Sequence, residues 1–360
     1  MVLKHLSQYP YSDDFKRIMA WQLAIPTARH GDQIEGLDYI QLVRGQQANF
    51  PEVRLTHTEL LFKSGQFDKG FQGIETLHRF HKQEPVWLTG LADIARNHDT
   101  IGTDVAVRYY REALAQDRWY RDAFEKFVDL YREERQFDKA LALFSEYSHY
   151  AQRYPSCAVL QSFVLVENQR IDQAMELFAE NIPHLRGNLD HWRNMRFVLE
   201  REGFPGERRT LEQLAATLNP ENVAGLLFAA SIAADAGDAE RVKQLASQAA
   251  MVDADDPAPK TMQAYGAYLA GDVESALESF ETIKNKYRDD PFVLTYYSLM
   301  LAQTGQQPTQ AADMARVAMF GNESDFTSRM HLCRVYYLTG RYDLCVGEAR
   351  KAITAYRDHF

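Results

Sequence analysis

The chain has 360 residues and a formal net charge of −10, with 46% hydrophobic and 25% charged residues. This composition is typical of a globular protein and excludes a disordered chain. The negative net charge, without a long run of Lys or Arg, argues against binding to a nucleic-acid backbone, so we expect no nucleic-acid partner.

The sequence also limits the compartment and the chemistry of the protein. No window holds the roughly 18 apolar residues of a membrane-spanning helix, and the stretch from Met1 to Gln8 lacks the apolar region of a secretory signal. We therefore expect a cytoplasmic protein without membrane insertion, or a periplasmic one if the sequence is an excised piece. Three cysteines, widely spaced, are too few for a disulfide framework or a zinc cage, so no metal or cofactor is expected.

A turn signal recurs along the chain about every 34 residues. Arg135 and Gln169 occupy this position in the middle of the chain. Elsewhere it is held by glycines that follow apolar helical stretches: Gly31, Gly65, Gly203, Gly237, Gly271, Gly305 and Gly340. Such a period is the signature of stacked repeats.

Prolines mark the beginning of a helix in the same rhythm. Pro51 and Pro85 are 34 residues apart, as are Pro257 and Pro291. Proline is best tolerated at the first position of a helix, where its missing N–H would have no helical partner. Each repeat therefore reads as helix, tight turn, helix and short polar link.

The repeats can be placed in chain order. Residues 1–16 are predicted to be an N-terminal leader, and residues 17–360 a single array of repeats. The repeats are expected to start near residues 17, 51, 84, 121, 155, 189, 223, 257, 291 and 326.

Three positions depart from the pattern. Pro26 falls inside the first helix of the first repeat and should kink it. Extra residues around 97–104 should make the turn of the third repeat bulge. Glu212 occupies a slot that is otherwise apolar, where burial is costly unless the carboxylate is paired.

These features resemble the tetratricopeptide repeat (TPR) family. Its pattern is visible from Leu294 through Gly305, from Trp192 through Gly203, and from Leu332 through Asp343. The resemblance covers nearly the whole chain, as about ten tandem repeats. It implies an all-α fold, a right-handed superhelical α-solenoid of helix-turn-helix repeats.

In TPR proteins the first helix of each repeat lines a concave groove in which partners bind. Projected onto this chain, that face gives a mostly apolar strip interrupted by charges. The resemblance thus implies a partner-binding face made of Trp21, Leu55, Glu59, Phe62, Leu88, Glu125, Asp129, Arg132, Val159, Phe163, Arg193, Phe197, Leu227, Tyr265, Tyr268, Leu299, Arg334 and Tyr337. Any single apolar member could instead pack between repeats, whereas exposed aromatic side chains as a set favour a binding surface.

Signatures of catalysis are missing from the sequence. It contains no phosphate-binding glycine loop, no zinc-protease motif and no nucleophile elbow. His78 and His81 lie three residues apart without a third metal ligand, and the Asp pairs before Pro257 and Pro291 suit helix capping. We expect no catalytic residues and no enzymatic activity.

The leading hypothesis is a protein-interaction scaffold that holds a peptide or helical segment of a partner in its groove. The alternatives are a TPR region of a larger cell-envelope polysaccharide-export or secretion assembly, and the regulatory repeats of an enzyme. The last helix still carries Val346, Ile353, Tyr356 and Phe360, so we expect more chain, a partner or a second copy (a homo-oligomer) to cover it. Cys333 and Cys345 should face each other across the last turn, either as buried thiols or as a redox pair.

Overall fold

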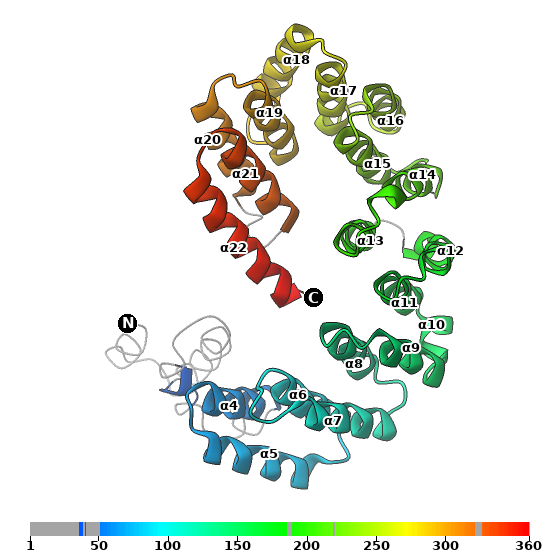
Figure 1. The fold of residues 1–360 in the computed structure, drawn as a ribbon, viewed down its shortest axis with the longest axis vertical. Coiled ribbons are helices and arrows are strands. Elements are labelled where there is room, and N and C mark those ends of the chain that lie inside the picture. Colours follow the sequence, from blue (N-terminus) through cyan, green and yellow to red (C-terminus); the bar gives the residue numbers. More distant parts are fainter. Residues whose placement is uncertain are drawn as a thin grey trace. The chain divides into compact units, whose positions relative to one another are not determined.

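A computed structural model describes residues 36–38, 40, 51–185, 189–218, 220–320 and 326–359. Every regular element in these ranges is a helix, with no strand among them (Figure 1). The α-helices are α4 (Pro51–Lys63), α5 (Phe67–His81), α6 (Pro85–Arg96), α7 (Thr103–Gln116), α8 (Arg121–Glu133), α9 (Phe137–Glu146), α10 (His149–Arg153), α11 (Pro155–Glu167), α12 (Ile171–Asn181), α13 (Asp190–Arg201), α14 (Arg208–Leu218), α15 (Val223–Asp235), α16 (Ala239–Val252), α17 (Pro257–Leu269), α18 (Val273–Lys286), α19 (Pro291–Gln303), α20 (Pro308–Met319), α21 (Phe326–Leu338) and α22 (Tyr342–His359), with 3-10 turns η2 (Ile182–Leu185) and η3 (Pro205–Glu207).

The helices pack in consecutive pairs, and within each unit most first helices also pack on the first helix of the next pair. Direct packing joins α15 to α16 and to α17, and likewise α19 to α20 and to α21. This arrangement confirms the predicted fold class, an all-α solenoid of helix-turn-helix repeats. We call the leading member of each pair its first helix: α4, α6, α8, α11, α13, α15, α17, α19 and α21.

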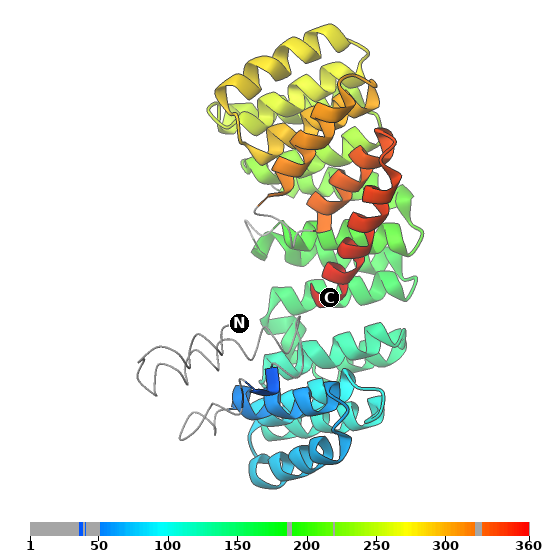
Figure 2. The same cartoon turned by 90° about the vertical axis from the view of Figure 1, so that its left-hand side faces the viewer.

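The packing divides the chain into two compact units. The N-terminal unit ends at Arg153 and the C-terminal unit begins at Tyr154. Figure 2 shows the stacked helices α4–α7 of the N-terminal unit in blue and cyan. The described first helices begin at or within one residue of the predicted repeat starts. The single array over residues 17–360 stays a prediction, and the leader at 1–16, the start at 17, Gly31 and Pro26 lie outside the described residues.

The turn inside each repeat contains at least one residue with a positive φ angle, and the turn between α19 and α20 contains two, Gly305 (68°) and Gln307 (45°). Glycine provides it at most turns, for example at Gly237 (φ 74°), because it has no Cβ to clash. Arg135 (φ 53°) and Gln169 (φ 61°) adopt the same left-handed conformation with side chains attached. The predicted equivalence of these two positions to the turn glycines is confirmed.

The bulge predicted in the third repeat is also present. Six residues, 97–102, separate α6 from α7, whereas three residues, 134–136, separate α8 from α9. The longer link still ends on a glycine with positive φ, Gly102 (93°).

Helix starts follow the local sequence signals. Proline is the first residue of α6, α11, α17 and α19, among others. The Asp256 carboxylate accepts a hydrogen bond from the Ala258 backbone N–H (2.8 Å), and that of Asp290 accepts from Phe292 and Val293 (both 3.0 Å). The capping role predicted for these two acidic residues is confirmed.

Small residues bring paired helices together. The predicted small slots are all buried: Ala140, Ala174, Ala230, Ala264, Ala276 and Ala311. Aromatic rings fill the remaining space, with Phe124 stacked on Tyr150 (4.2 Å between ring centroids) and Phe280 on Tyr297 (5.0 Å). The core is therefore a continuous layer between helices within each unit.

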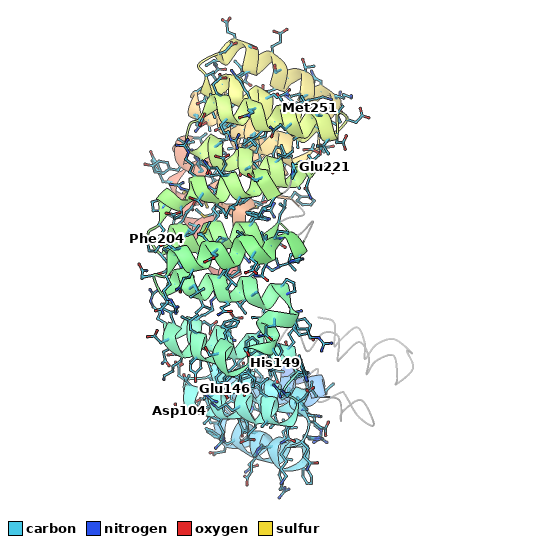
Figure 3. All side chains as sticks on the ribbon, turned by 90° about the vertical axis from the view of Figure 1, so that its right-hand side faces the viewer. Asp104, Glu146, His149, Phe204, Glu221 and Met251 are labelled. Atoms are coloured by element: carbon cyan, nitrogen blue, oxygen red, sulfur yellow. The ribbon has the colours of Figure 1, made fainter. Side chains whose placement is uncertain are left out.

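Ion pairs link equivalent positions of successive repeats. His78 on α5 contacts Glu112 on α7 at 2.8 Å, and Arg111 on α7 contacts Glu146 on α9 at 3.3 Å. Figure 3 labels Glu146 on α9. The paired residues are 34 and 35 positions apart, which is the period of the sequence. Ion pairs at the surface each stabilise a protein by only about 0–1 kcal/mol.

Glu212 on α14 is buried and paired. Arg241 on α16 donates its Nε–H to Glu212 Oε1 at 2.7 Å. The predicted cost of a carboxylate in this slot is thus offset by an ion pair with the second helix of the next repeat.

The last repeat leaves apolar surface accessible. Tyr342, Leu344 and Val346 on α22 are exposed. The side chains of Ile353 and Tyr356, and Phe360 altogether, lie outside the described residues. Among the helices that the structure describes, none is long and apolar enough to cross a membrane.

Candidate functional site

The candidate site lies on the first helices of the C-terminal unit. Figure 1 shows α13, α15, α17, α19 and α21 on the inner side of the curve that this unit makes. Each of these helices contributes a polar or aromatic side chain to one group, which we call the inner cluster. Its members are Arg196, Asp235, Tyr265, Tyr296, Gln303 and Arg334.

The centre of the inner cluster is a carboxylate shared by two arginines. Asp235 accepts hydrogen bonds from Arg196 through Oδ2 and from Arg334 through Oδ1, the latter at 3.4 Å. Arg196 also donates to Glu200 at 3.0 Å. Arg334 is 99 residues away from Asp235 in sequence, so this contact ties α21 to α15.

Burial and charge have opposite effects on Arg196. Burial lowers the pKa of its guanidinium, but Asp235 and Glu200 together outweigh that effect and raise it above the ordinary value. The side chain is therefore fixed as a cation and as a donor to Asp235.

Tyrosines form the floor of the inner cluster. Tyr265 and Tyr296 are buried, and their rings meet edge to face at 5.1 Å. The Tyr265 hydroxyl donates to Gln303 Oε1 at 3.1 Å. Burial raises the pKa of both phenols further above its ordinary value.

Most apolar members of the predicted binding face are core residues, which corrects the expectation of an open apolar strip. Neighbouring first helices pack directly on one another, so the large side chains between them are covered. The buried members are Phe62, Leu88, Val159, Phe163, Leu227, Tyr265 and Leu299.

The charged members in the N-terminal unit are held by neighbours on their own helices. Glu59 pairs with Lys63 at 2.8 Å, and Asp129 pairs with Arg132 at 2.9 Å. Glu125 pairs with Arg121 at 2.7 Å. These contacts are local to one helix turn and do not assemble the residues into one site.

The remaining predicted residues are accessible to different degrees. Leu55, Phe197 and Tyr268 are half-buried, and Arg193 is exposed beside Asp190 (3.4 Å). Arg334 and Tyr337 are exposed on α21, and 62% of Tyr337 is open to solvent. Trp21 lies outside the described residues.

Arg334 and Tyr268 lie near each other although they belong to α21 and α17. Burial raises the pKa of the Tyr268 phenol, and the charge of Arg334 opposes this rise. Tyr268 also contacts Tyr265 (5.5 Å between ring centroids). We call Tyr268, Arg334 and Tyr337 the accessible edge. Tyr337 stands three residues after Arg334 on α21, and its ring contacts Tyr342 on α22 (5.7 Å between ring centroids).

Four members of the inner cluster were missed by the sequence argument: Arg196, Asp235, Tyr296 and Gln303. One signal was available for Asp235, which is the only charged residue of the otherwise apolar α15. The partners of this carboxylate lie 39 and 99 residues away, and no local pattern identifies them.

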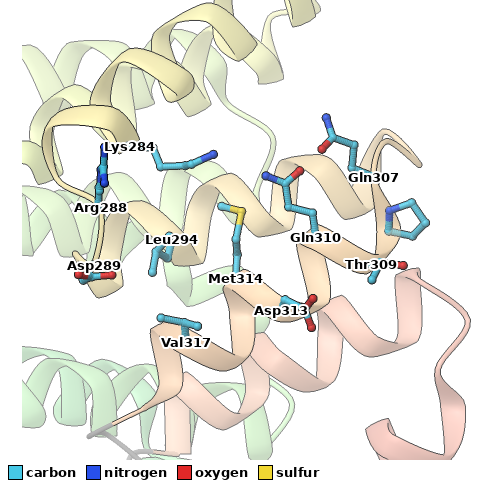
Figure 4. A pocket seen from close by; sticks show the side chains of 11 residues that line it. Lys284, Arg288, Asp289, Leu294, Gln307, Thr309, Gln310, Asp313, Met314 and Val317 are labelled. Carbon is cyan, nitrogen blue, oxygen red and sulfur yellow. The ribbon is translucent and has the colours of Figure 1, made fainter.

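A concavity of about 600 Å³ lies away from the inner cluster, beside α18, α19 and α20 (Figure 4). Leu294, Met314 and Val317 form its apolar side, while Lys284, Arg288 and Asp313 stand around its edge. Lys284 and Asp313 are already engaged with Glu281 and Arg316. The opening is shallow and its charges are largely balanced, so it lacks convergent polar groups for a small ligand.

Metal ligands do not converge in the described ranges, where no group of three His, Cys, Asp or Glu side chains is placed to hold an ion. His78 contacts Glu112, and His81 contacts Glu84 (2.9 Å) and stacks on Trp87 (4.0 Å between ring centroids). Both histidines therefore have structural partners.

Comparisons with known proteins give similarity in structure alone. No protein-family model matches the chain, and no curated protein matches it by sequence. A crystal structure of the APC/C hetero-tetramer Cut9–Hcn1 is similar at 13% identity, covering 94% of this chain and 72% of that chain with a TM-score of 0.33. The human IFIT1 dimer with PPP-AAAA is similar at 11% identity, covering 92% of this chain and 89% of that chain with a TM-score of 0.34. The human IFIT1 dimer with m7Gppp-AAAA is similar at 11% identity, covering 96% of this chain and 90% of that chain with a TM-score of 0.33.

Proposed function

We propose that the protein is a non-catalytic, TPR-like scaffold that binds a segment of a partner protein along the first helices of its C-terminal unit. The observation that carries this proposal is the accessible edge, where Arg334 of α21 lies near Tyr268 of α17 and the exposed Tyr337 follows three residues later on α21. Tyrosine and arginine are the residue types that contribute most to protein-binding surfaces.

The proposal is supported by the contacts that hold the side chains of this edge in place before a partner binds. Arg334 is held by Asp235, and Asp235 is held in turn by Arg196. Tyr268 lies against the buried Tyr265. A partner would meet side chains whose positions are already fixed, which lowers the entropy cost of binding.

The partner is proposed to be an extended or helical segment with apolar or aromatic anchors. Only part of the face inferred from the TPR resemblance is available to it, because residues such as Phe163 and Tyr265 are buried. Replacing either of those two by alanine would lower the free energy of unfolding by about 3–5 kcal/mol. A loss of binding in such a variant could therefore not be distinguished from a loss of stability.

The test places a photo-crosslinking amino acid at Tyr337 in the full chain, in lysate of the native host. The matched control carries it at Met251, which is 85% exposed on α16 (Figure 3). We expect one or a few proteins to crosslink from position 337 and not from 251.

A second measurement uses the protein identified in this way. Tyr268→Ala combined with Arg334→Ala should weaken its affinity at least tenfold with unchanged helicity. Arg316→Gln, which alters an exposed pair on α20, should leave the affinity as it was. Equal crosslinking from both positions, or full affinity in the double variant, would refute this face as the binding site.

A further inference from the structure

The last described repeat places two thiols against each other across its turn. Cys333 lies on α21 and Cys345 on α22, and the Cys333 S–H donates to the backbone carbonyl of Cys345 at 3.6 Å. The Cys333 sulfur therefore contacts the residue that carries the second thiol, and a disulfide requires their two Cα atoms to lie within about 7 Å of each other.

The same two positions hold small, buried residues in other repeats. Ser162 with Ala174, and Ala264 with Ala276, are likewise 12 residues apart on the two helices of one pair, and all four are buried. Small side chains at these slots let the helices approach closely. In the last repeat both slots hold cysteine instead.

Access differs between the two cysteines. Cys333 is buried, whereas Cys345 is half-buried and can be reached from solvent. Burial, followed by the neighbouring Cys345, raises the pKa of the Cys333 thiol to about 11, which keeps it protonated at neutral pH. Cys345 is therefore the thiol that an external reagent meets first.

We propose that Cys333 and Cys345 form a reversible intrachain disulfide by exchange with a small-molecule disulfide such as oxidised glutathione. The Cys345 thiolate attacks one sulfur of the reagent and releases one equivalent of glutathione thiolate. Cys333 then loses its proton and attacks the Cys345 sulfur, releasing the second equivalent. Two protein thiols are oxidised, and one glutathione disulfide is reduced to two thiols.

This modification goes beyond the proposed scaffold role. The bond would fasten α21 to α22, and α21 is the helix that presents Arg334 and Tyr337. Oxidation would therefore stabilise the last repeat against local opening, because it closes a short loop in the unfolded ensemble.

The test equilibrates the full chain with mixtures of oxidised and reduced glutathione until the product composition no longer changes. Intact mass, alkylation and non-reducing peptide mapping then report the products. We expect the loss of two hydrogens, one remaining alkylatable thiol at Cys157, and a linked pair of peptides carrying Cys333 and Cys345. Amide protection of α21 and α22 should rise on oxidation.

Two variants complete the experiment. Cys345→Ala introduces the residue that other repeats carry at this slot, so it should fold and show neither the bond nor the gain in protection. Cys157→Ser should keep both. Persistent glutathione on Cys345 without linkage, three alkylatable thiols under oxidising mixtures, or linkage through Cys157 would overturn the proposal.

Discussion

At the scale of single residues, the turn positions show how the array tolerates local strain. Arg135 and Gln169 occupy left-handed conformations that glycine takes in the other turns. A side chain in this region costs roughly 1 kcal/mol or more relative to glycine. The array therefore keeps its geometry at two turns against an unfavourable local term, because packing of the flanking helices fixes the backbone.

Gln169→Gly should stabilise the protein by about 0.5 kcal/mol. Relief of the positive-φ strain exceeds the extra entropy of glycine in the unfolded chain, although the two effects partly cancel. Urea unfolding followed by circular dichroism measures the change.

The matched control is Glu176→Gly on the exposed face of α12, which should destabilise by about 0.7–1 kcal/mol since it places glycine inside a helix. Destabilisation of similar size in both variants would show that position 169 carries no strain.

At the scale of elements, the spacing between paired helices depends on small side chains. Ala140 on α9 is fully buried near α8, where Phe124 and Phe127 are also buried. The helices of a pair cannot separate without losing these aromatic contacts, so the small slot has little room for a larger residue.

Ala140→Trp should lower the free energy of unfolding by about 1–3 kcal/mol through overpacking. The same substitution at Ala142, which is exposed on the same helix, should change stability by less than about 0.5 kcal/mol. Thermal or urea unfolding of the two variants beside the parent gives the comparison. Equal stability of all three would contradict the close contact at residue 140.

At the scale of the whole molecule, contacts are mostly between neighbours. Within each unit most first helices pack on the next first helix, and ion pairs such as His78–Glu112 and Arg111–Glu146 link repeats about one period apart. The exception among the described residues is the inner cluster, where Arg334 reaches Asp235 across 99 residues. When contacts are mostly between neighbours, the stability of the protein is approximately a sum of the stabilities of single repeats and of the interfaces between adjacent repeats. Such a chain need not unfold as one cooperative core.

Hydrogen exchange should therefore show several local openings rather than a single global one. Introducing Ala140→Trp in the N-terminal unit should lower amide protection in α8 and α9 and leave that of α17 and α19 within error of the parent. A uniform fall in protection along the chain would indicate one cooperative unit.

The sequence by itself determined the repeat, the turns and the helix starts, because each depends on residues within a few positions of one another. The period exposed Arg135 and Gln169 as turn residues, and Pro257 with Asp256 marked a helix start. These features follow from backbone sterics and local hydrogen bonds, which act regardless of the rest of the chain.

The tertiary structure alone decided which side chains of the first helices are covered and which polar groups meet. The TPR resemblance implies that Leu88 and Leu299 belong to a binding face, yet neighbouring helices bury both. Asp235 finds its arginines on α13 and α21 because the curvature of the C-terminal unit lets their long side chains reach α15. Curvature accumulates from small rotations between many pairs, and no single segment of the sequence encodes it.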